Sequence, residues 1–276
     1  MREGAALAYL LARTSDSIAD SSSADARLRA HCLRAFQAQL AGLEDYRSWP
    51  AELVTGVKDV SERDLLALSH RLLELVHDLP SAELALVQEV MNIIIGGQML
   101  DLKHFGAAHA DKPVVMGSSD DLEDYTYRVA GCVGEFWTKL GLLSLGNCFS
   151  SASPCTLLEL AVNYGKGLQL VNILRDLPRD LSEGRCYLPV SDPLDRELLM
   201  LEHHRQWHRA IGLINDGLTY SSQLTGKRVR VASVMPALLA EENLELMREI
   251  GWEALEAHVK VARRKVYGNL LHALLY

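Results

Sequence analysis

The sequence predicts an all-α fold that forms one domain over residues 1–276. Hydrophobic residues make up 49% of the chain but aromatic residues only 6%, and the apolar mass is mostly Leu, Ala and Val. That composition suits helix packing better than a sheet-rich fold. Apolar residues also recur at helical spacing along most of the chain, and no strand-rich region, internal repeat or linker interrupts them.

Helix boundaries in the N-terminal part follow from capping residues and breaks. Asp25, which follows a serine cluster, is a suitable N-cap, and Pro50 marks a break or the start of a short helix. Ser61 and Ser81 begin the next two apolar periodic runs. The expected helices cover about residues 3–20, 25–43, 61–77 and 81–105, and a loop follows over residues 106–119.

Further helices are expected in the C-terminal part, where Gly and Pro raise local questions. Gly131 and Gly134 lower helix propensity, and they serve close helix packing, room for a substrate chain, or both. Pro178 is expected to kink or end its helix. The basic residues after Gly226 are expected to form a turn, which is more often a solvated loop than a phosphate site. The expected helices cover about residues 120–145, 193–224, 236–250 and 252–276, and a further helix begins at Pro154, in a segment that Gly184 and Pro189 close.

Two carboxylates, Asp176 and Asp180, lie four residues apart after an apolar run with helical spacing. On a helix this spacing places them on one face, one turn apart. Such a pair suits Mg²⁺, which takes one or two carboxylates and completes its octahedron with water and substrate phosphates. Gln169, Asn172 and Arg175 project from the same or neighbouring faces. Together these groups are able to hold a metal–phosphate cluster.

A second pair with the same spacing, Asp16 and Asp20, lies near the start of the chain, one turn after Arg13. An apolar run with helical spacing again precedes the carboxylates. If two such helices face each other, four carboxylates hold several Mg²⁺ ions bridged by a diphosphate. The chemistry would then be metal-assisted departure of diphosphate from an allylic carbon, with an apolar pocket around the carbocation. The alternative is that Asp16 and Asp20 are ordinary surface charges.

Three segments of the chain resemble the squalene/phytoene synthase family, the head-to-head prenyl synthases. ARTSDSIAD is similar to the family's first aspartate-rich motif, DYTYRVAGCVGEFW to its tyrosine-containing segment, and LQLVNILRDLPRDLSEGRCYLP to its second aspartate-rich motif. The third match is long and specific, and the resemblance extends over nearly the whole chain. Within the family, the chain looks most like a bacterial squalene synthase.

The resemblance implies an isoprenoid-synthase-type helical bundle around a central cavity, and a reaction in two steps. One prenyl diphosphate ionises, and its cation is captured by the double bond of the other, which gives a cyclopropylcarbinyl diphosphate. A second ionisation rearranges that ring to a linear product. In squalene synthases NADPH delivers a hydride to the last cation, whereas phytoene and dehydrosqualene synthases lose a proton instead.

The resemblance also assigns roles to individual residues. Tyr127 would lie near the reacting carbons, and Arg264 is a weaker candidate for a phosphate contact. Ser17 stands where many members carry a further aspartate, and the family's N-terminal helix is missing or shortened, because the first motif begins close to Met1. The implied Mg²⁺ ligands are Asp16, Asp20, Asp176 and Asp180, and the implied diphosphate or metal contacts are Arg13, Gln169, Asn172 and Arg175.

The leading functional hypothesis is a prenyltransferase that converts two farnesyl diphosphates to squalene through presqualene diphosphate. The alternatives are a phytoene or dehydrosqualene synthase and a catalytically silent helical relative. The retained carboxylates, with their amide and arginine neighbours, argue against the silent relative. The expected cofactors are Mg²⁺ and, for squalene formation, NADPH. The sequence predicts neither the prenyl chain length nor the oligomeric state.

Composition limits the other classes of function. The formal net charge of −8 argues against nucleic acid as a partner. The five cysteines show no CxxC pair, and no zinc site is expected from the cysteines or histidines; His203 and His204 are expected on a solvated helix face. No signal peptide or membrane span is expected, so the protein is predicted to be cytoplasmic. Peripheral membrane contact is a hypothesis, because the product would be very apolar.

Overall fold

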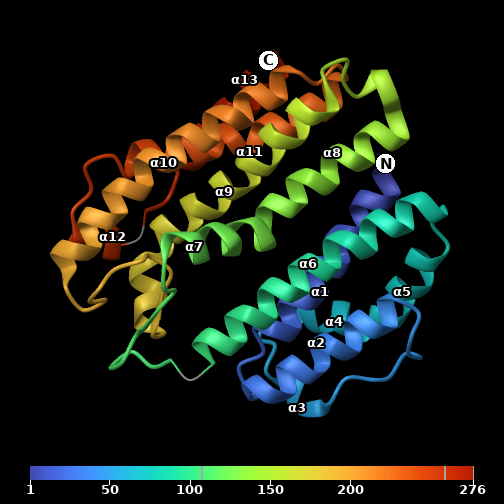
Figure 1. Ribbon diagram of the computed structural model, residues 1–276, viewed down its shortest axis with the longest axis horizontal. Coiled ribbons are helices and arrows are strands. Elements are labelled where there is room, and N and C mark those ends of the chain that lie inside the picture. Colours follow the sequence, from blue (N-terminus) through green and yellow to red (C-terminus); the bar gives the residue numbers. More distant parts are fainter. Residues whose placement is uncertain (107, 258, 276) are drawn as a thin grey trace. The chain divides into compact units, whose positions relative to one another are not determined.

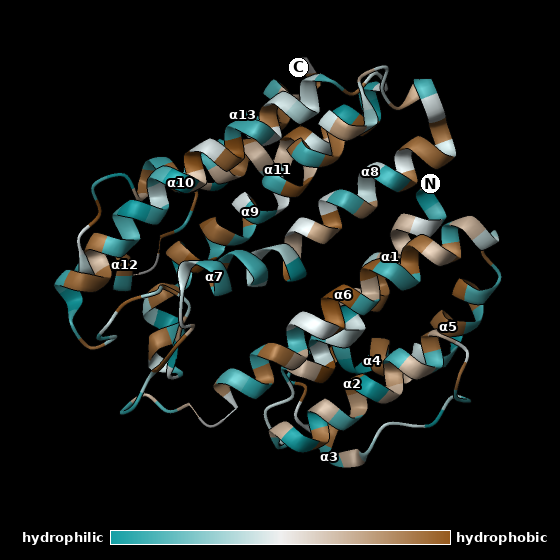
Figure 2. Ribbon diagram, viewed as in Figure 1, coloured by the Kyte–Doolittle hydropathy of each residue, from teal (hydrophilic) through white to brown (hydrophobic). Residues whose placement is uncertain are grey.

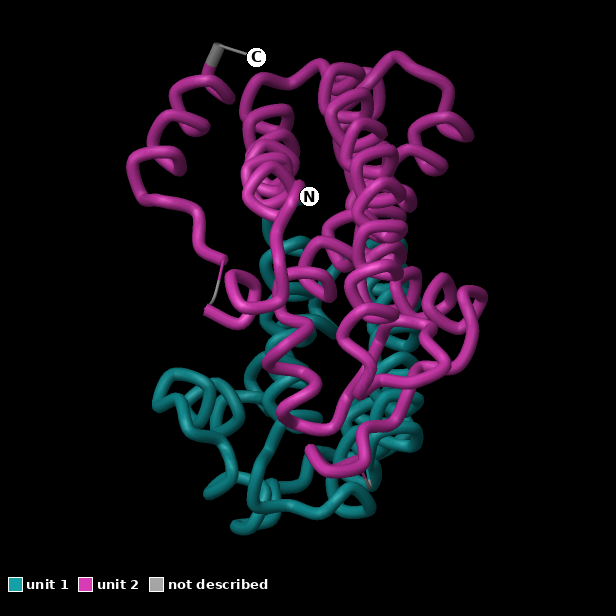
Figure 3. Tube along the Cα trace, turned by 90° about the vertical axis from the view of Figure 1, so that its left-hand side faces the viewer, with its two compact units in different colours: residues 1–106 teal, residues 107–276 magenta. Residues whose placement is uncertain are grey.

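The computed structural model describes residues 1–106, 108–257 and 259–275, and it confirms the predicted all-α fold (Figure 1). The chain divides into two compact units, Met1–Gly106 and Ala107–Tyr276, which Figure 3 shows in different colours. Each unit is helical. The expectation of a single domain therefore stays a prediction. Each unit carries one of the two carboxylate pairs.

Three long helices form the body of the N-terminal unit. Its helices are α1 (Arg2–Ala19), α2 (Ala26–Leu40), α3 (Ala51–Thr55), α4 (Val60–Ala67), α5 (Ser69–His77) and α6 (Ser81–Phe105). α1 packs against α2 and α6, and α2 also packs against α6. Leu11, Leu33, Phe36 and Ile95 are fully buried among these helices. Their helical spacing gives each long helix one apolar stripe, and burying those stripes together forms the core.

The helix expected over residues 61–77 is in fact two helices, with Leu68 between them. The Ser69 hydroxyl donates to the Leu66 carbonyl at 2.7 Å, and the Trp49 indole donates to the Ser69 hydroxyl at 2.9 Å. Such side-chain hydrogen bonds compete with the regular helical ladder, so the helix restarts at this point. The N-cap is Asp59, whose carboxylate accepts from the Ser61 N–H at 2.7 Å, rather than Ser61 itself.

The C-terminal unit is organised around α9. Its elements are β1 (Val114–Val115), α7 (Ser119–Thr126), the π-helical turn η1 (Tyr127–Gly131), α8 (Cys132–Leu145), the 3₁₀ turn η2 (Gly146–Cys148), α9 (Pro154–Ser182), β2 (Arg185–Cys186), α10 (Arg196–Ser222), α11 (Lys227–Leu246), α12 (Trp252–Glu256) and α13 (Arg263–Leu275). α9 packs against α8, α10 and α11. Because α9 is surrounded in this way, side chains on its different faces reach several neighbours.

Several predicted boundaries in this unit are wrong. The helix expected over residues 120–145 is interrupted by η1. Of the two outcomes expected at Pro178, a kink or an end, the helix does not end, because α9 continues to Ser182. The basic residues after Gly226 form the first turn of α11 rather than a free turn, and Pro236 lies inside that helix. α12 and α13 replace the one helix expected from residue 252, whose last residue lies outside the described residues.

A short parallel strand pair anchors the loop before α7. β1 pairs with β2, with Val114 opposite Arg185 and Val115 opposite Cys186. The Val114 N–H donates to the Gly184 carbonyl and the Met116 N–H to the Cys186 carbonyl, both at 2.8 Å. Because parallel pairing satisfies these backbone groups, the segment after α9 is held in place.

Glycines bring α8 and α9 into close contact. A Cβ atom on Gly134 would lie 2.1 Å from the Ala161 carbonyl oxygen, and one on Gly165 would lie 2.3 Å from the Ala130 carbonyl oxygen. Real Cβ atoms do not approach backbone so closely, so a larger side chain would force the helices apart. Close packing is therefore one role of Gly134, as the sequence suggested.

Hydrophobic and hydrophilic residues both occur along every long helix (Figure 2). Each helix thus has an apolar face to bury and a polar face to expose. Among the described residues, no helix is both long enough and apolar enough to cross a membrane.

Candidate active site

Four polar side chains form one stripe along α9. Gln169, Asn172, Asp176 and Asp180 are separated by three, four and four residues, which is the spacing of one helical face. Because α9 continues through Pro178, Asp180 belongs to the same helix as Asp176. Asn172 is exposed, Gln169 and Asp176 are partly buried, and Asp180 is buried. One face of the helix therefore carries amide and carboxylate oxygens that range from exposed to buried.

Arg175 holds the Asp176 carboxylate in a fixed orientation. Its Nε donates to Oδ1 at 2.9 Å, and a terminal guanidinium nitrogen donates to Oδ2 at 2.8 Å. Such a two-point pair is stronger and more directional than a single ion pair. Arg175 remains 30% exposed and Asp176 17%, so both groups can still reach a ligand.

Burial makes ionisation of the Asp180 carboxyl group unfavourable. Only 7% of the residue is exposed, and burial raises the pKa of its carboxyl to about 6 despite the opposing influence of Arg185. Arg185, at the start of β2, donates to Oδ1 at 3.2 Å. A buried, partly compensated carboxylate gains stability when a further cation binds, which is the behaviour expected of a metal ligand.

His203 supports α9 between Asn172 and Asp176. Pro178 has no N–H, so the Leu174 carbonyl lacks its usual donor one turn further along the helix. The His203 side chain, from α10, makes a hydrogen bond to the Leu174 backbone. His203 is only 2% exposed, so the expectation of a solvated face is wrong for this residue. A neighbouring helix thus supplies the donor that Pro178 removes.

The N-terminal unit carries the other pair at the end of α1. Gln98, from α6, donates to Asp16 Oδ1 at 2.8 Å and to the Ser15 hydroxyl at 3.0 Å. Burial raises the pKa of Asp16 to about 6, and repulsion from Asp20 raises it further, although 45% of the side chain remains accessible. Asp20 is exposed at the C-cap. The two carboxylates therefore lie close enough to repel each other, which favours a shared cation.

Arg13 is the cationic neighbour of this pair. Its guanidinium lies 3.9 Å from Asp16 Oδ2 and also forms an ion pair with Glu62. Neither Gln98 nor Glu62 was predicted from the sequence, because both come from distant positions with no recognisable motif. The Arg13 side chain is 45% exposed, so it remains free to meet an anionic group.

Tyr127 is the first residue of the π-helical turn η1. Its hydroxyl donates to Glu135 at 2.8 Å, and Lys166 from α9 lies 5.8 Å from the ring centre. Burial and the Glu135 carboxylate raise the pKa of Tyr127 to about 12, so the phenol is neutral at physiological pH. Lys166 is also paired with Glu123, and Glu123 with Arg209. These charged neighbours had no signal in the sequence.

An apolar pocket of about 400 Å³ lies beside η1 in the C-terminal unit. Gly165 and Leu168 are part of its wall, and they precede Asn172 and Asp176 on the same stripe of α9. One helix face thus changes from apolar to carboxylate-bearing over about 12 Å, at 1.5 Å per residue. The pocket is lined by Val129, Ala130, Val133, Gly134, Trp137, Ala161, Tyr164, Gly165, Leu168, Tyr220, Ala232, Ser233 and Pro236.

Comparison with known proteins identifies the family. Residues 1–265 match the family model described as squalene/phytoene synthase. The chain belongs to the squalene/phytoene synthase family. The predicted membership is therefore confirmed, and the carboxylates discussed above all lie within the matched region.

Relatives in the squalene/phytoene synthase family match parts of the chain. Presqualene diphosphate synthase of Zymomonas mobilis is 35% identical over 123 residues, which are 45% of this chain and 36% of that protein. Phytoene synthase of Thermus thermophilus is 30% identical over 167 residues, which are 55% of this chain and 54% of that protein. The aligned regions thus span between about a third and about half of these relatives.

Solved structures from the same family share the fold. TcSQS in complex with the ligand E5700 superposes with a TM-score of 0.77 at 21% identity, covering 100% of this chain and 80% of that one. Squalene synthase HpnC from Alicyclobacillus acidocaldarius gives a TM-score of 0.54 at 20% identity, covering 86% of this chain and 79% of that one. At these identities the likeness concerns the all-α fold.

The donor chemistry of the two aspartate pairs fits Mg²⁺. Over residues 1–106, 108–257 and 259–275, no three or more His, Cys, Asp and Glu side chains cluster into a metal cage. Mg²⁺ does not require one, because it usually binds one or two carboxylates and takes its other ligands from water and phosphates. Asp176 with Asp180, and Asp16 with Asp20, each provide such a pair.

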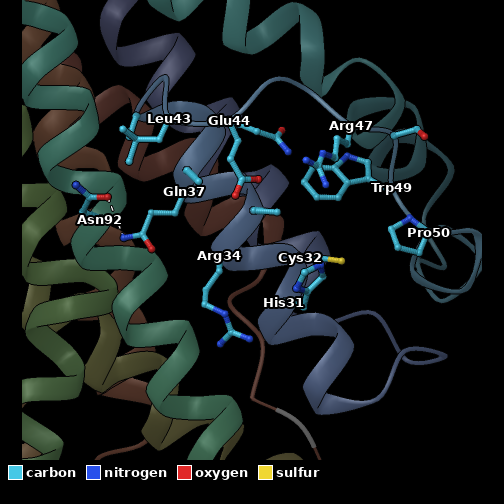
Figure 4. A pocket seen from close by; sticks show the side chains of 15 residues that line it. His31, Cys32, Arg34, Gln37, Leu43, Glu44, Arg47, Trp49, Pro50 and Asn92 are labelled. Atoms are coloured by element: carbon cyan, nitrogen blue, oxygen red, sulfur yellow. Dashed lines mark hydrogen bonds between the residues drawn. The ribbon is translucent and has the colours of Figure 1, made fainter.

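A pocket of the N-terminal unit does not involve the predicted residues. It has a volume of about 740 Å³ and lies between α2 and the segment that precedes α3 (Figure 4). Leu43, Glu44 and Arg47, which line it, are all exposed, and a Gln37–Asn92 hydrogen bond of 3.0 Å lies at its edge. None of its lining residues belongs to either aspartate motif, so its size does not make it the active site.

Arg264 is the predicted residue with the least structural support. It lies on the first turn of α13 and is exposed. It lines neither the apolar pocket beside η1 nor the pocket between α10, α11 and α13, which includes the adjacent Lys265. Its assignment as a phosphate contact stays a prediction.

Proposed function

We propose that the protein condenses two prenyl diphosphates head to head, with two farnesyl diphosphates giving presqualene diphosphate and then squalene. One observation carries the proposal: a single stripe of α9 runs from the apolar wall formed by Gly165 and Leu168 to the polar groups of Asn172 and Asp176. An amphipathic substrate with an apolar chain and a diphosphate head matches that change in polarity.

The polar residues would bind and orient the diphosphates. Arg175 offers a guanidinium next to Asp176, and Asn172 offers an exposed amide one turn earlier. Asp176 and Asp180, together with Asp16 and Asp20, would hold Mg²⁺. The bound metal would neutralise the charge that develops on the departing diphosphate. Because the chain has a net charge of −8, anionic substrates would otherwise be repelled.

The apolar residues would protect the carbocation that forms when the carbon–oxygen bond to diphosphate breaks. In the first step the second substrate's double bond supplies the electron pair for the new carbon–carbon bond, and a proton is lost as the cyclopropane ring closes. Tyr127 lies two residues before Val129 of the pocket wall, and its neutral phenol would offer a polarisable ring to a nearby carbocation. Water is excluded there because most of the lining is apolar.

A second candidate function stops after the first step. The likeness to a presqualene diphosphate synthase, at 35% identity over 123 residues, favours release of the cyclopropylcarbinyl diphosphate itself. A phytoene-type reaction is the other variant, with longer substrates and proton loss in place of hydride transfer. NADPH distinguishes these outcomes, because only the reduced thirty-carbon product requires a hydride donor.

Product analysis tests the proposal directly. The protein is incubated with farnesyl or geranylgeranyl diphosphate and Mg²⁺, with and without NADPH, and the products are identified by mass spectrometry. We expect presqualene diphosphate without NADPH and squalene with it. Accumulation of presqualene diphosphate under both conditions would support the second candidate, and a forty-carbon product would exclude both. No product from either substrate would favour a silent relative.

The metal ligands are tested by removal. We expect EDTA to abolish turnover and excess Mg²⁺ to restore it. Asp176→Ala should lower turnover by roughly 10³-fold or more while leaving the fold nearly intact, because a stabilising group at the site of developing charge is lost. Glu159→Gln is the matched control, since Glu159 is an exposed carboxylate on the same helix. Unchanged activity of Asp176→Ala would show that the metal assignment is wrong.

Peripheral membrane contact is part of the same proposal, because an apolar product must leave the pocket for an apolar phase. Flotation with liposomes of neutral and anionic composition tests it. Recovery of the protein in the liposome fraction would support the contact, and complete absence from that fraction would exclude it.

A further inference from the structure

Two exposed imidazoles meet on α10, at a distance in sequence from both aspartate motifs. His204 and His208 are four residues apart, so they project from one helical face. Their Nε2 atoms lie 3.0 Å apart, and the ring planes are at 89° to each other. His203 points into the protein, whereas His204 and His208 are both exposed. His204 and His208 therefore have the His-x-x-x-His spacing that places two imidazoles on one helical face.

The contact between the two nitrogens has a simple chemical meaning. Without a metal, one Nε2 of the His204–His208 pair carries the proton and donates it to the other. When the donor ring carries its proton on Nδ1 instead, its Nε2 lone pair becomes available, and neutral imidazole is the commonest metal ligand in proteins. A divalent ion in place of the shared proton would thus be held by two lone pairs. Water would complete its coordination, because both side chains are exposed.

The distance between the nitrogens indicates which ions fit. With metal–nitrogen bonds of about 2.0–2.1 Å, nitrogen atoms 3.0 Å apart subtend roughly 95° at the ion. That angle is close to the right angle between neighbouring ligands in tetragonal or octahedral complexes, and smaller than the tetrahedral angle. Cu²⁺ and Ni²⁺ prefer the former geometry and Zn²⁺ the latter.

We propose that His204 and His208 form a two-histidine binding site for Cu²⁺ or Ni²⁺ on the exposed face of α10. The site is independent of the proposed prenyl transfer, because hard Mg²⁺ prefers oxygen ligands and does not compete for imidazole. Over the described ranges no third His, Cys, Asp or Glu joins the pair into a larger cluster. Two protein ligands therefore bind the ion, at an affinity set by chelation.

Trp207 provides a built-in reporter of this site. Its ring is nearly parallel to that of His204, at 8° with centroids 6.0 Å apart, and lies 5.0 Å from the ring of His208. Its indole nitrogen donates to the Leu244 carbonyl at 2.8 Å, so the ring is fixed. A paramagnetic Cu²⁺ ion held by the adjacent imidazoles quenches the fluorescence of such a tryptophan.

The test is a titration of the purified, untagged full chain with CuSO₄ in buffer that contains Mg²⁺. Tryptophan fluorescence and calorimetry follow binding, and we expect one ion per chain. His204→Ala and His208→Ala should each weaken binding by roughly 10²-fold, because chelation is lost, and the double variant should weaken it little further. Electron paramagnetic resonance of the wild type should show a tetragonal Cu²⁺ with two nitrogen ligands.

His31→Ala is the matched control, because His31 is exposed on α2 and has Arg27 and Ala35 one turn away instead of a second histidine. It should bind Cu²⁺ as the wild type does. The proposal is overturned if each single variant keeps half of the stoichiometry, if the variants bind like the wild type, or if His31→Ala shows the same loss. Tighter binding of Zn²⁺ than of Ni²⁺ would overturn the inferred geometry.

Discussion

At the scale of single residues, His203 is a buried side chain of α10 that forms a hydrogen bond to the Leu174 backbone of α9. It is 2% exposed, and among the described residues its Nε2 has no hydrogen-bond partner. Burial lowers the pKa of its imidazole to about 4, against an ordinary value of 6.5, and the hydrogen bond to Leu174 only partly opposes that effect. The folded protein therefore requires this histidine to be neutral.

This requirement predicts an acid-sensitive contribution to stability. Because the pKa of His203 is lower in the folded than in the unfolded state, its contribution is complete above about pH 6.5 and is lost as the pH falls toward 4. The loss should approach roughly 3 kcal/mol, at about 1.4 kcal/mol for each unit of pKa. Urea unfolding of the wild type and His203→Asn, at intervals from pH 7.5 to 4, measures it.

His203→Asn keeps a donor near the position of Nδ1 but does not titrate. We expect its free energy of unfolding to fall less than that of the wild type over this range, whatever its value at pH 7.5. Parallel curves for the two proteins would show that another group causes the acid sensitivity. Comparing the difference between the curves cancels the titration of groups that both proteins share.

The burial of His203 could have been predicted from the sequence. Leu199, Ala210 and Ile214 are buried on α10, and His203 lies four residues after the first and seven before the second. The helical period thus places it on the apolar stripe, but the neighbouring charged and histidine residues suggested a solvated face. By contrast, the contacts Gln98–Asp16 and Glu135–Tyr127 depend on how separate turns meet, and no local pattern indicates them.

At the scale of elements, the α8–α9 pair depends on the absence of side chains. Gly134→Ala should destabilise the protein by about 1–3 kcal/mol, because its Cβ would lie 2.1 Å from the Ala161 carbonyl oxygen and the helices would have to separate. Gly134 also lines the apolar pocket, so the substitution should raise KM for the prenyl substrate as well. Thermal unfolding and steady-state kinetics check both effects.

Gly212→Ala is the matched control for that substitution. Gly212 lies inside α10, and a Cβ there would meet no atom within 4 Å. We expect Gly212→Ala to stabilise the protein by up to about 1 kcal/mol through helix propensity alone. If both variants change stability by the same amount, packing between α8 and α9 does not explain the need for Gly134.

Pro178 and His203 link α9 and α10. Pro178 leaves the Leu174 carbonyl of α9 without a backbone donor, and His203 of α10 supplies one. Pro178→Ala restores an N–H that can reach the Leu174 carbonyl, so the histidine is needed less. His203→Leu should therefore cost roughly 1 kcal/mol less in the Pro178→Ala background than in the wild type. Urea unfolding of the four proteins in this cycle measures the coupling. Additive effects would show that the two residues act separately.

Local patterns predicted these elements well where caps and periodicity agree. α1, α2 and α6 begin and end within a few residues of the expected positions, because Asp25 and Pro80 mark clear starts. Pro178 is expected to kink or end its helix, and α9 does not end there, because the missing backbone donor is compensated from α10. The π-helical turn at Tyr127 has no distinct composition, so sequence alone could not reveal it.

At the scale of the whole molecule, the same combination of charges occurs in both compact units. Each carries one aspartate pair with a neighbouring arginine: Asp16 with Arg13 in the first, and Asp176 with Arg175 in the second. The long motif around Asp176 could be recognised from the sequence because its residues are consecutive. Whether the two pairs act together could not be recognised from the sequence, since that depends on the folded arrangement of distant segments.

If the protein binds Mg²⁺ and diphosphate together, its melting temperature should respond to the two ligands in a specific way. Mg²⁺ and inorganic diphosphate together should raise the melting temperature of the wild type more than the sum of their separate effects, because each ligand needs the other to neutralise charge. At a hundredfold excess over Kd, the gain is about 2.7 kcal/mol. Asp16→Ala and Asp176→Ala should each remove the part of the gain that depends on the altered pair, whereas Glu159→Gln should keep the whole gain. If both aspartate variants keep the whole gain, the proposed Mg²⁺ ligands are wrong.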